Sequence, residues 1–309
     1  MSMEFDFFIP SSDKVSRIHG IHWLASGRTR AVLQISHGMI EHIGRYRELA
    51  EYFNSRGIAV IGHDHLGHGK TTDVEAHGIF AVENGAYYVL EDIKIVSEYI
   101  KRQYPGIPHF LLGHSMGSFF ARRFLTIYGE MFQGVILTGA GEQHGITLRA
   151  GSAVVAKAVK KQGRFAFDLR LHNLVLGGYN KLFAPVRTGH DWLSRDMEEA
   201  LKYEADPDCQ FIFSNGAYED FFQIMLDLSH KRQFERIPKN LPVLLLSGDQ
   251  DPVGQKGKGV YRVYRKLKKT GLVDVSIKLY PGARHELFKE INRLEVFEDI
   301  RVFMTARIN

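Results

Sequence analysis

The residues Gly113-His114-Ser115-Met116-Gly117 form a G-x-S-x-G motif, in which the serine follows an apolar run and precedes an amphipathic one. Small residues on either side of the serine permit a sharp turn that exposes its hydroxyl at the end of a strand. A serine hydroxyl attacks a carbonyl carbon effectively only when a neighbouring base takes its proton. We therefore interpret Ser115 as a catalytic nucleophile. The alternative is a glycine-rich turn without chemistry.

Candidates for a base and for the acid that orients it lie near the C-terminus. His285 is the only histidine after Asp251, and it follows a strand predicted over residues 275–279. Asp251 and Asp249 both follow a strand predicted over residues 242–246. The chain order serine, acid, histidine is typical of hydrolases with this motif. We predict His285 as the base and Asp251 as its partner, and Asp249 is either the alternative acid or a turn-forming residue.

An oxyanion hole, which stabilises the charge that develops on the attacked carbonyl, requires two backbone N–H groups directed at one oxygen atom. Met116, the residue after the nucleophile, supplies the first. We assign the second to Met39, because it follows a strand predicted over residues 30–35. Gly38 gives this loop the freedom to direct the donor.

The elements that must position these residues alternate along the chain. Short apolar runs predict strands and amphipathic runs predict helices, which together indicate an α/β fold with a mostly parallel central sheet and helices on both faces. The runs 4–9 and 15–24 alternate polar and apolar residues and are predicted to be antiparallel edge strands. The other predicted strands cover residues 30–35, 58–61, 110–112, 134–137, 242–246 and 275–279, and the predicted helices cover residues 46–53, 89–104, 118–128, 259–269 and 294–304.

This alternation stops between Glu142 and Arg236, in a helix-favouring stretch too long to be a loop within a compact domain. We predict an α/β-hydrolase core formed by residues 1–141 and 237–309, with residues 142–236 as an inserted helical cap whose ends return to the same edge of the sheet. Basic residues between Arg149 and Arg187 alternate with apolar ones. That composition fits peripheral contact with an anionic membrane as well as a solvated face over a packed cap.

Composition excludes several other classes of protein. The 309 residues are 44% hydrophobic and 24% charged, as in ordinary globular proteins. A single cysteine, Cys209, cannot form an intramolecular disulfide or a site of several thiolates. His63, His65 and His68 lie close together in the sequence, but Asp64 is the only carboxylate beside them, so we predict no metal site.

The charge and the N-terminal residues indicate where the protein acts. A net charge of +5 without a recognition motif predicts no binding to nucleic acid. Acidic residues near the N-terminus argue against a secretory signal, and no apolar run approaches the ~20 residues that cross a bilayer. We expect a cytoplasmic protein that is peripheral to a membrane if the basic segment binds one. The oligomeric state is left open.

Several motifs together resemble those of the monoacylglycerol lipase and lysophospholipase group of α/β-hydrolases. The matching segments are His37-Gly38-Met39-Ile40-Glu41-His42-Ile43-Gly44-Arg45-Tyr46, Asp64-His65-Leu66-Gly67-His68-Gly69, the motif around Ser115, and Asp191-Trp192-Leu193-Ser194-Arg195-Asp196, which is similar to a cap motif of bacterial members. The resemblance covers nearly the whole chain. It implies hydrolysis of single-chain lipid esters through an acyl-enzyme, with no cofactor.

The resemblance also suggests substrate-binding residues at the alcohol end, namely His37, Gly38, Glu41 and Arg45, although Glu41 and Arg45 could instead brace their loop. Met39, Ile40 and Phe288 depart from the small or polar residues common in the family, and we expect a bulkier or more apolar alcohol pocket. Alternatives with the same triad are a small-ester esterase, an aminopeptidase or amidase, and an acyltransferase. A ligand-binding receptor on this fold is a further alternative.

Overall fold

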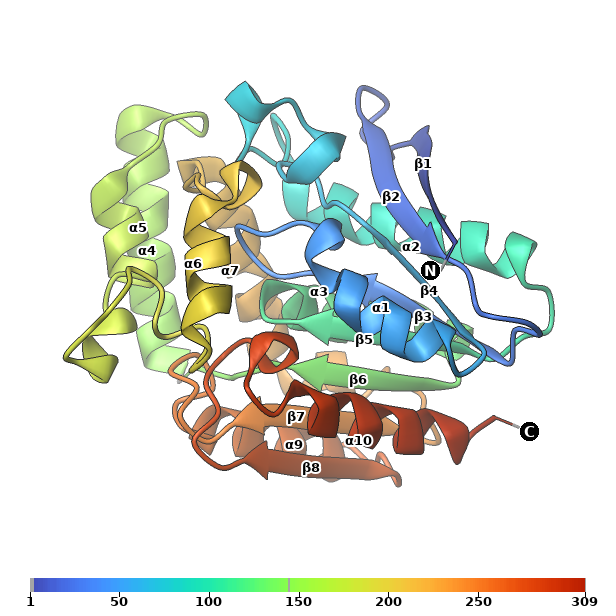
Figure 1. The fold of residues 1–309 in the computed structure, drawn as a ribbon. Helices are drawn as coiled ribbons and strands as arrows, with labels where there is room; N and C mark the ends of the chain where they lie inside the picture. Colours follow the sequence, from blue (N-terminus) through green and yellow to red (C-terminus); the bar gives the residue numbers. More distant parts are fainter. Residues whose placement is uncertain (1–2, 144, 309) are drawn as a thin grey trace.

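The computed structural model describes residues 3–143 and 145–308, and at its centre lies an eight-stranded sheet (Figure 1). Its strand order is β1-β2-β4-β3-β5-β6-β7-β8, in which the strands from β3 to β8 are parallel. This arrangement confirms the predicted α/β class and mostly parallel sheet. The strands are β1 (Glu4–Pro10), β2 (Arg17–Trp23), β3 (Ala31–Ser36), β4 (Ile58–His63), β5 (His109–His114), β6 (Gly134–Thr138), β7 (Val243–Gly248) and β8 (Val275–Tyr280).

The N-terminal strands differ from the prediction in one respect. Both are antiparallel to their neighbours, as expected, but only β1 lies at the edge, because β2 pairs with β1 on one side and with β4 on the other. The prediction that β2 is an edge strand was therefore wrong. The pairing with β1 occupies the backbone edge that an edge strand leaves free. The residues of β2 from Ile18 onward are buried, with Ile18 in a cluster that includes Val96 and Ile100 of α2.

Helices cover both faces of the sheet. In Figure 1, α1 and α10 pack on the near face, and α2, α3 and α9 lie behind it. This agrees with the hydrophobic clusters, since α1 and α10 share one cluster and the other three helices belong to the remaining two. The strands from β3 to β7 are buried along their whole length, as expected for parallel strands covered on both sides. These five helices are α1 (Arg47–Asn54), α2 (Gly85–Gln103), α3 (Met116–Tyr128), α9 (Lys258–Lys269) and α10 (Arg293–Thr305).

The segment between β6 and β7, which are neighbours in the sheet, is helical. Its helices are α4 (Gly145–Gln162), α5 (Leu169–Val175), α6 (Met197–Ala205), α7 (Asn215–Ser229) and α8 (Lys231–Phe234). Figure 1 shows α4 to α7 beyond one end of the strands, and α7 also packs on α2 and α3. The division into a core and a cap over residues 142–236 stays a prediction. No helix within the two described ranges has the length and apolarity to cross a membrane.

The register of the sheet explains why distant residues meet. Ser36 at the end of β3 is paired with Gly113 near the end of β5, and Gly113 is paired with Leu137 of β6. The carboxyl ends of parallel strands share one edge of a sheet, and ligands bind in the crevice beyond that edge. The loops that follow β3, β5, β7 and β8 therefore converge beneath the inserted helices.

Candidate active site

Ser115 occupies a strained turn between β5 and α3. Its backbone has φ 49° and ψ −120°, which is rare for a residue with a side chain. The flanking glycines are required by close packing: a Cβ on Gly117 would lie 2.0 Å from the carbonyl oxygen of Ser36, and one on Gly113 would lie 2.7 Å from the carbonyl oxygen of Gly117. The G-x-S-x-G pattern thus reflects the space available in this turn.

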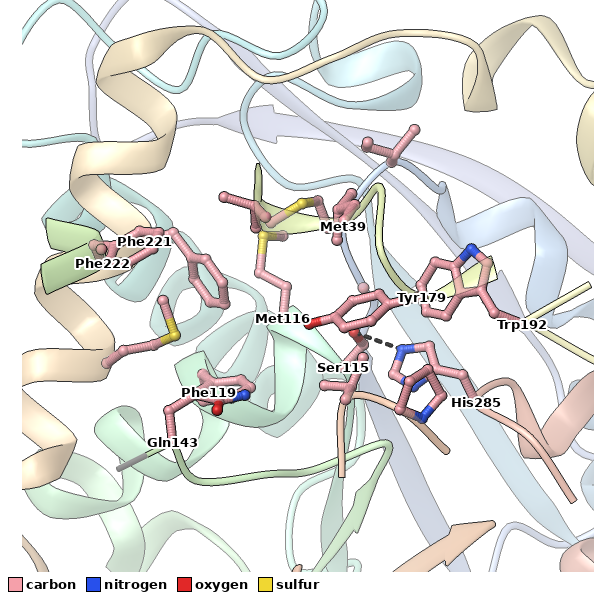
Figure 2. A pocket seen from close by; sticks show the side chains of 18 of the residues that line it. Met39, Ser115, Met116, Phe119, Gln143, Tyr179, Trp192, Phe221, Phe222 and His285 are labelled. Atoms are coloured by element: carbon pink, nitrogen blue, oxygen red, sulfur yellow. Dashed lines mark hydrogen bonds between the residues drawn. The ribbon is translucent and has the colours of Figure 1, made fainter. Parts of the chain in front are cut away.

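The structure brings the three predicted triad residues together. Nε2 of His285 lies 2.8 Å from Oγ of Ser115 (Figure 2). Nδ1 of the same ring lies 3.0 Å from Oδ1 of Asp251. Asp251 is fully buried, and its Oδ1 also accepts a hydrogen bond from the N–H of Val253 at 2.8 Å. These distances allow His285 to take a proton from Ser115 while Asp251 holds the ring in one orientation.

Asp249, the alternative acid, has a different position. Its Oδ1 accepts hydrogen bonds from the N–H of Gly282 at 2.8 Å and from the side chain of Gln250 at 3.1 Å. It therefore braces the turn that leads to His285, and no hydrogen bond links it to the imidazole.

The surroundings of His285 favour a readily protonated ring. Burial opposes the charged form, but the charge of Asp251 and its hydrogen bond more than offset this, so the pKa of His285 is raised above its usual value. Trp192 stacks against the ring at a centroid distance of 5.0 Å, and its carbonyl accepts a hydrogen bond from the N–H of His285 at 3.4 Å. The role of Trp192 was not predicted, although it lies within a motif that carried the family resemblance.

The predicted oxyanion loop lies against the nucleophile. A Cβ on Gly38 would be 3.1 Å from Cβ of Ser115, which shows how closely this loop approaches. In the described part of the chain, the N–H groups of Met39 and Met116 have no protein acceptor. Two free donors beside a nucleophile can stabilise a developing oxyanion. The assignment of both donors remains a proposal.

Ile40, which follows Met39 in this loop, has a strained backbone conformation. It has φ 58°, a left-handed conformation that is strained for a β-branched residue. Its N–H donates to Nε2 of His68 at 3.3 Å, and its carbonyl accepts from the hydroxyl of Tyr203 on α6 at 2.8 Å. Burial lowers the pKa of His68 to about 4, so this ring is neutral and can accept. These two contacts hold the strained residue in place.

Glu41 and Arg45 both form hydrogen bonds within the protein. Glu41 accepts hydrogen bonds from the N–H of Gly38 and, at 2.9 Å, from the hydroxyl of Tyr46. Arg45 forms two hydrogen bonds of 2.8 Å with the carboxylate of Glu286. Glu41 lines the main cavity, whereas Arg45 does not. The contacts therefore favour bracing of the loop as the role of Arg45.

His37 and Phe288, also singled out in the sequence, lie outside the cavity lining. His37 is fully buried, its Nδ1 lies 2.8 Å from the carbonyl oxygen of Gly38, and its Nε2 accepts from the N–H of His65 at 3.0 Å. Phe288 packs against Tyr46 in the core. His37 thus supports the loop from beneath. Phe288 lines a small hollow together with Glu41, Arg45 and Glu286, and the expectation of a bulkier or more apolar alcohol pocket stays a prediction.

A cavity of about 590 Å³ opens above Ser115. This volume suits a drug-sized or single-chain lipid ligand. Figure 2 shows Phe221 and Phe222 on one side of Ser115, with Trp192 and His285 on the other. Most of the lining is apolar and comes from the inserted helices, including Leu148, Gly151, Val154, Leu171, Leu174, Val175, Phe221, Phe222 and Met225.

One group of potential metal ligands was not predicted. His42, Asp206 and Cys209 lie close enough together to share an ion. Nε2 of His42 is already 2.9 Å from Oδ2 of Asp206, and burial raises the pKa of the Cys209 thiol well above its usual range. A protonated thiol is a poor ligand. We interpret this group as a contact between the oxyanion loop and the insert.

The fold and the site define a class: an α/β-hydrolase with a serine, histidine and aspartate at the carboxyl edge of its sheet. Residues 27–292 match the family model described as serine aminopeptidase, S33. The chain belongs to this family of hydrolases.

Several relatives are similar over most of their length. Monoglyceride lipase from Homo sapiens is 30% identical over 289 residues, which cover 93% of this chain and 86% of that protein. Monoacylglycerol lipase from Mycolicibacterium smegmatis is 26% identical over 290 residues, covering 93% and 92%. A thermostable carboxyl esterase from Bacillus coagulans, solved in complex with glycerol, superposes with a TM-score of 0.91 at 29% identity and full coverage of both chains. These findings confirm the family predicted from the motifs.

The two aspartates can be separated by substitution. Asp251→Asn should lower kcat by about 10⁴, because an amide does not hold the imidazole in the tautomer that accepts the serine proton. Asp249→Asn keeps a side-chain oxygen that can accept the hydrogen bond from the N–H of Gly282, so kcat should change little. Steady-state kinetics on folded variants checks this. A larger loss in Asp249→Asn would reverse the assignment.

The raised pKa of His285 predicts the pH dependence. Only the neutral imidazole accepts a proton, so the rate at which a fluorophosphonate labels Ser115 should rise with pH, with a midpoint above the usual histidine value of about 6.5. In Asp251→Asn the midpoint should fall, because burial then acts without the carboxylate. The midpoint in Asp249→Asn should stay where it is in the unmodified protein. An unchanged midpoint in Asp251→Asn would contradict the proposed pairing.

Proposed function

We propose that this protein hydrolyses carboxylic esters of single-chain lipids, such as monoacylglycerols and lysophospholipids. Ser115 attacks the ester carbonyl as His285 takes its proton, and the N–H groups of Met39 and Met116 stabilise the oxyanion. His285 then protonates the departing alcohol, which leaves an acyl-enzyme on Ser115. A water molecule activated by His285 releases the fatty acid. Asp251 stabilises the imidazolium in both steps.

The observation that carries this proposal is the position of the triad at the base of an apolar cavity of about 590 Å³. The leaving alcohol must lie beside Nε2 of His285, because that atom gives it a proton. The acyl chain then extends to the opposite side, where Phe221 and Phe222 lie (Figure 2). Each buried methylene contributes ~0.8 kcal/mol, so this surface favours a long chain. The names of the relatives, which include monoglyceride lipases, agree with this assignment.

The family description also names aminopeptidases, and the cavity argues against that activity here. An aminopeptidase must bind a free ammonium group on the acyl side of the bond that it cleaves. The carboxylates in the described lining, Glu41 and Glu286, cluster with Arg45 beside His285, on the alcohol side. The acyl side offers aromatic and aliphatic side chains instead, which suit a hydrocarbon tail.

Chain-length dependence tests the substrate class. We expect kcat/KM for monoacylglycerols to rise steeply with acyl length until the cavity is full. Gly151 lines the cavity, and a Cβ there would already lie 2.7 Å from the ring of Phe222. Gly151→Leu should therefore move the optimum to shorter chains. Hydrolysis rates over an ester series measure both effects.

The matched control for that variant is Gly178→Leu, because a Cβ on Gly178 would meet no atom within 4 Å. It should leave the optimum unchanged. Fluorophosphonate labelling that is lost in Ser115→Ala checks the nucleophile in the same preparations. A flat profile in the unmodified protein would count against a lipid substrate, and labelling that persists in Ser115→Ala would overturn the assignment of the nucleophile.

We also propose that the rim of the cavity meets an anionic membrane. Val154 on α4 and Leu174 on α5 both line the cavity, yet they are 46% and 63% exposed, so they mark its mouth. Further exposed apolar side chains, Ile146, Phe165, Phe167, Leu169, Leu182 and Val186, lie in the same segment. Of the basic run, Arg164 is paired with Glu219 and Asp220, and Arg187 with Asp191. The other members, all exposed, are Arg149, Lys157, Lys160, Lys161, Arg170 and Lys181.

Vesicle binding tests this surface. The protein should sediment with phosphatidylserine vesicles more than with neutral ones, and salt should weaken binding, because exposed charges are screened beyond ~8 Å at physiological ionic strength. Replacing Lys157, Lys160 and Lys161 by glutamate should abolish the preference. The same reversal at Lys268 and Lys269 on α9 is the control and should not. Binding that ignores both vesicle charge and salt would exclude an electrostatic membrane contact.

A further inference from the structure

The alcohol end of the cavity has an unusual distribution of charge. Glu41 and Glu286 line the cavity there, and both side chains are largely buried. Among the described residues of the lining, neither lysine nor arginine occurs. A leaving group beside His285 therefore meets carboxylates and no free cation.

Arg45 pairs with these carboxylates but does not line the cavity. Its two terminal nitrogens donate to the two carboxylate oxygens of Glu286, each at 2.8 Å, and Nη1 lies 3.5 Å from Oε2 of Glu41. The guanidinium also lies over the ring of Tyr203, 4.7 Å from its centroid. Two parallel hydrogen bonds to one carboxylate are the arrangement by which arginine would otherwise grip a phosphate. Glu286 thus occupies the donors that an anionic substrate would need.

Glu286 remains an anion in this setting. Burial opposes its charge, but the adjacent guanidinium outweighs that effect and lowers the pKa of Glu286 to about 2. Burial raises the pKa of Glu41, despite the opposing effect of Arg45. At neutral pH the group therefore carries no net positive charge, whichever form Glu41 adopts.

We propose that Glu286 is a specificity-determining residue, which holds Arg45 away from the substrate and thereby restricts the enzyme to esters of uncharged alcohols. An acylglycerol with free hydroxyls can donate hydrogen bonds to Glu41 and Glu286. An acylglycerol phosphate places its charge against these carboxylates, and a like charge in a desolvated site is strongly unfavourable. This inference rests on the proposed ester hydrolysis, and of the two substrate classes proposed above it selects monoacylglycerols over lysophospholipids.

The test compares two substrates that differ only in one phosphate, 1-acylglycerol and 1-acylglycerol 3-phosphate with the same acyl chain, both below their micelle concentrations. In the unmodified protein kcat/KM for the neutral ester should exceed that for the phosphate by at least roughly tenfold. In Glu286→Gln the ratio should fall by roughly tenfold, mainly through KM for the phosphate ester. Glu286→Asp, which keeps the charge, should retain the preference.

A double variant checks that the effect passes through Arg45. In Glu286→Gln/Arg45→Gln no cation remains to bind phosphate, so the gain on the phosphate ester should disappear. A loss of stability or of loop geometry in Glu286→Gln would lower the rates on both substrates by the same factor, and that result would overturn the proposal. Equal use of both esters by the unmodified protein would overturn it as well.

A binding measurement separates this inference from the proposed function. A 1-O-alkylglycerol and its 3-phosphate have no carboxylic ester to cleave. Either compound can protect Ser115 from a fluorophosphonate by occupying the cavity. The neutral ether should protect Ser115 of the unmodified protein better than its 3-phosphate does. In Glu286→Gln the protection given by the two compounds should become more nearly equal. If no ester is hydrolysed but this pattern appears, the proposed function fails while the charge selection stands. Equal protection in both proteins would refute the charge selection alone.

Discussion

The hydrogen bond between the hydroxyl of Ser115 and Nε2 of His285 joins residues that are 170 positions apart in the chain. It can form only if the loops after β5 and β8 reach the same point from different strands. Parallel pairing provides this convergence, because it places the carboxyl ends of β3, β5, β6, β7 and β8 along one edge. At Gly117 the turn after Ser115 packs so close to the end of β3 that no side chain would fit.

Much of this arrangement could be predicted because its signals are local. The apolar runs that form β3, β5 and β7 are continuous, since strands buried on both faces admit few polar residues. The nucleophile turn needs glycines at fixed positions, so its motif is readable from the sequence. The placement of His285 and Asp251 beside Ser115 could be predicted because each of the three residues follows a strand of the parallel part of the sheet. β2 was misjudged because sequence alternation does not show whether a second strand pairs along its other side.

The contacts between the helical segment that follows β6 and the loops after β3 and β8 could not be predicted in the same way. Tyr203 contacts Ile40, and Trp192 stacks on His285. Both contacts join the helical segment to loops of the sheet, and no periodicity within either segment encodes them. Glu286 illustrates the same limit. Its sequence neighbour His285 drew attention, but its partner Arg45 lies 241 positions earlier, and pairing between charges so far apart depends on the completed fold.

The hydroxyl of Tyr203 donates to the carbonyl of Ile40, the residue directly after the proposed oxyanion donor Met39. Ile40 is held in a left-handed conformation between that contact and His68. A displacement of α6 away from the sheet would break the first of these bonds and so remove one of the two contacts that hold the strained residue. Because Tyr203 also lines the cavity, the same movement would at once uncover the cavity and loosen the loop that carries the proposed oxyanion donor.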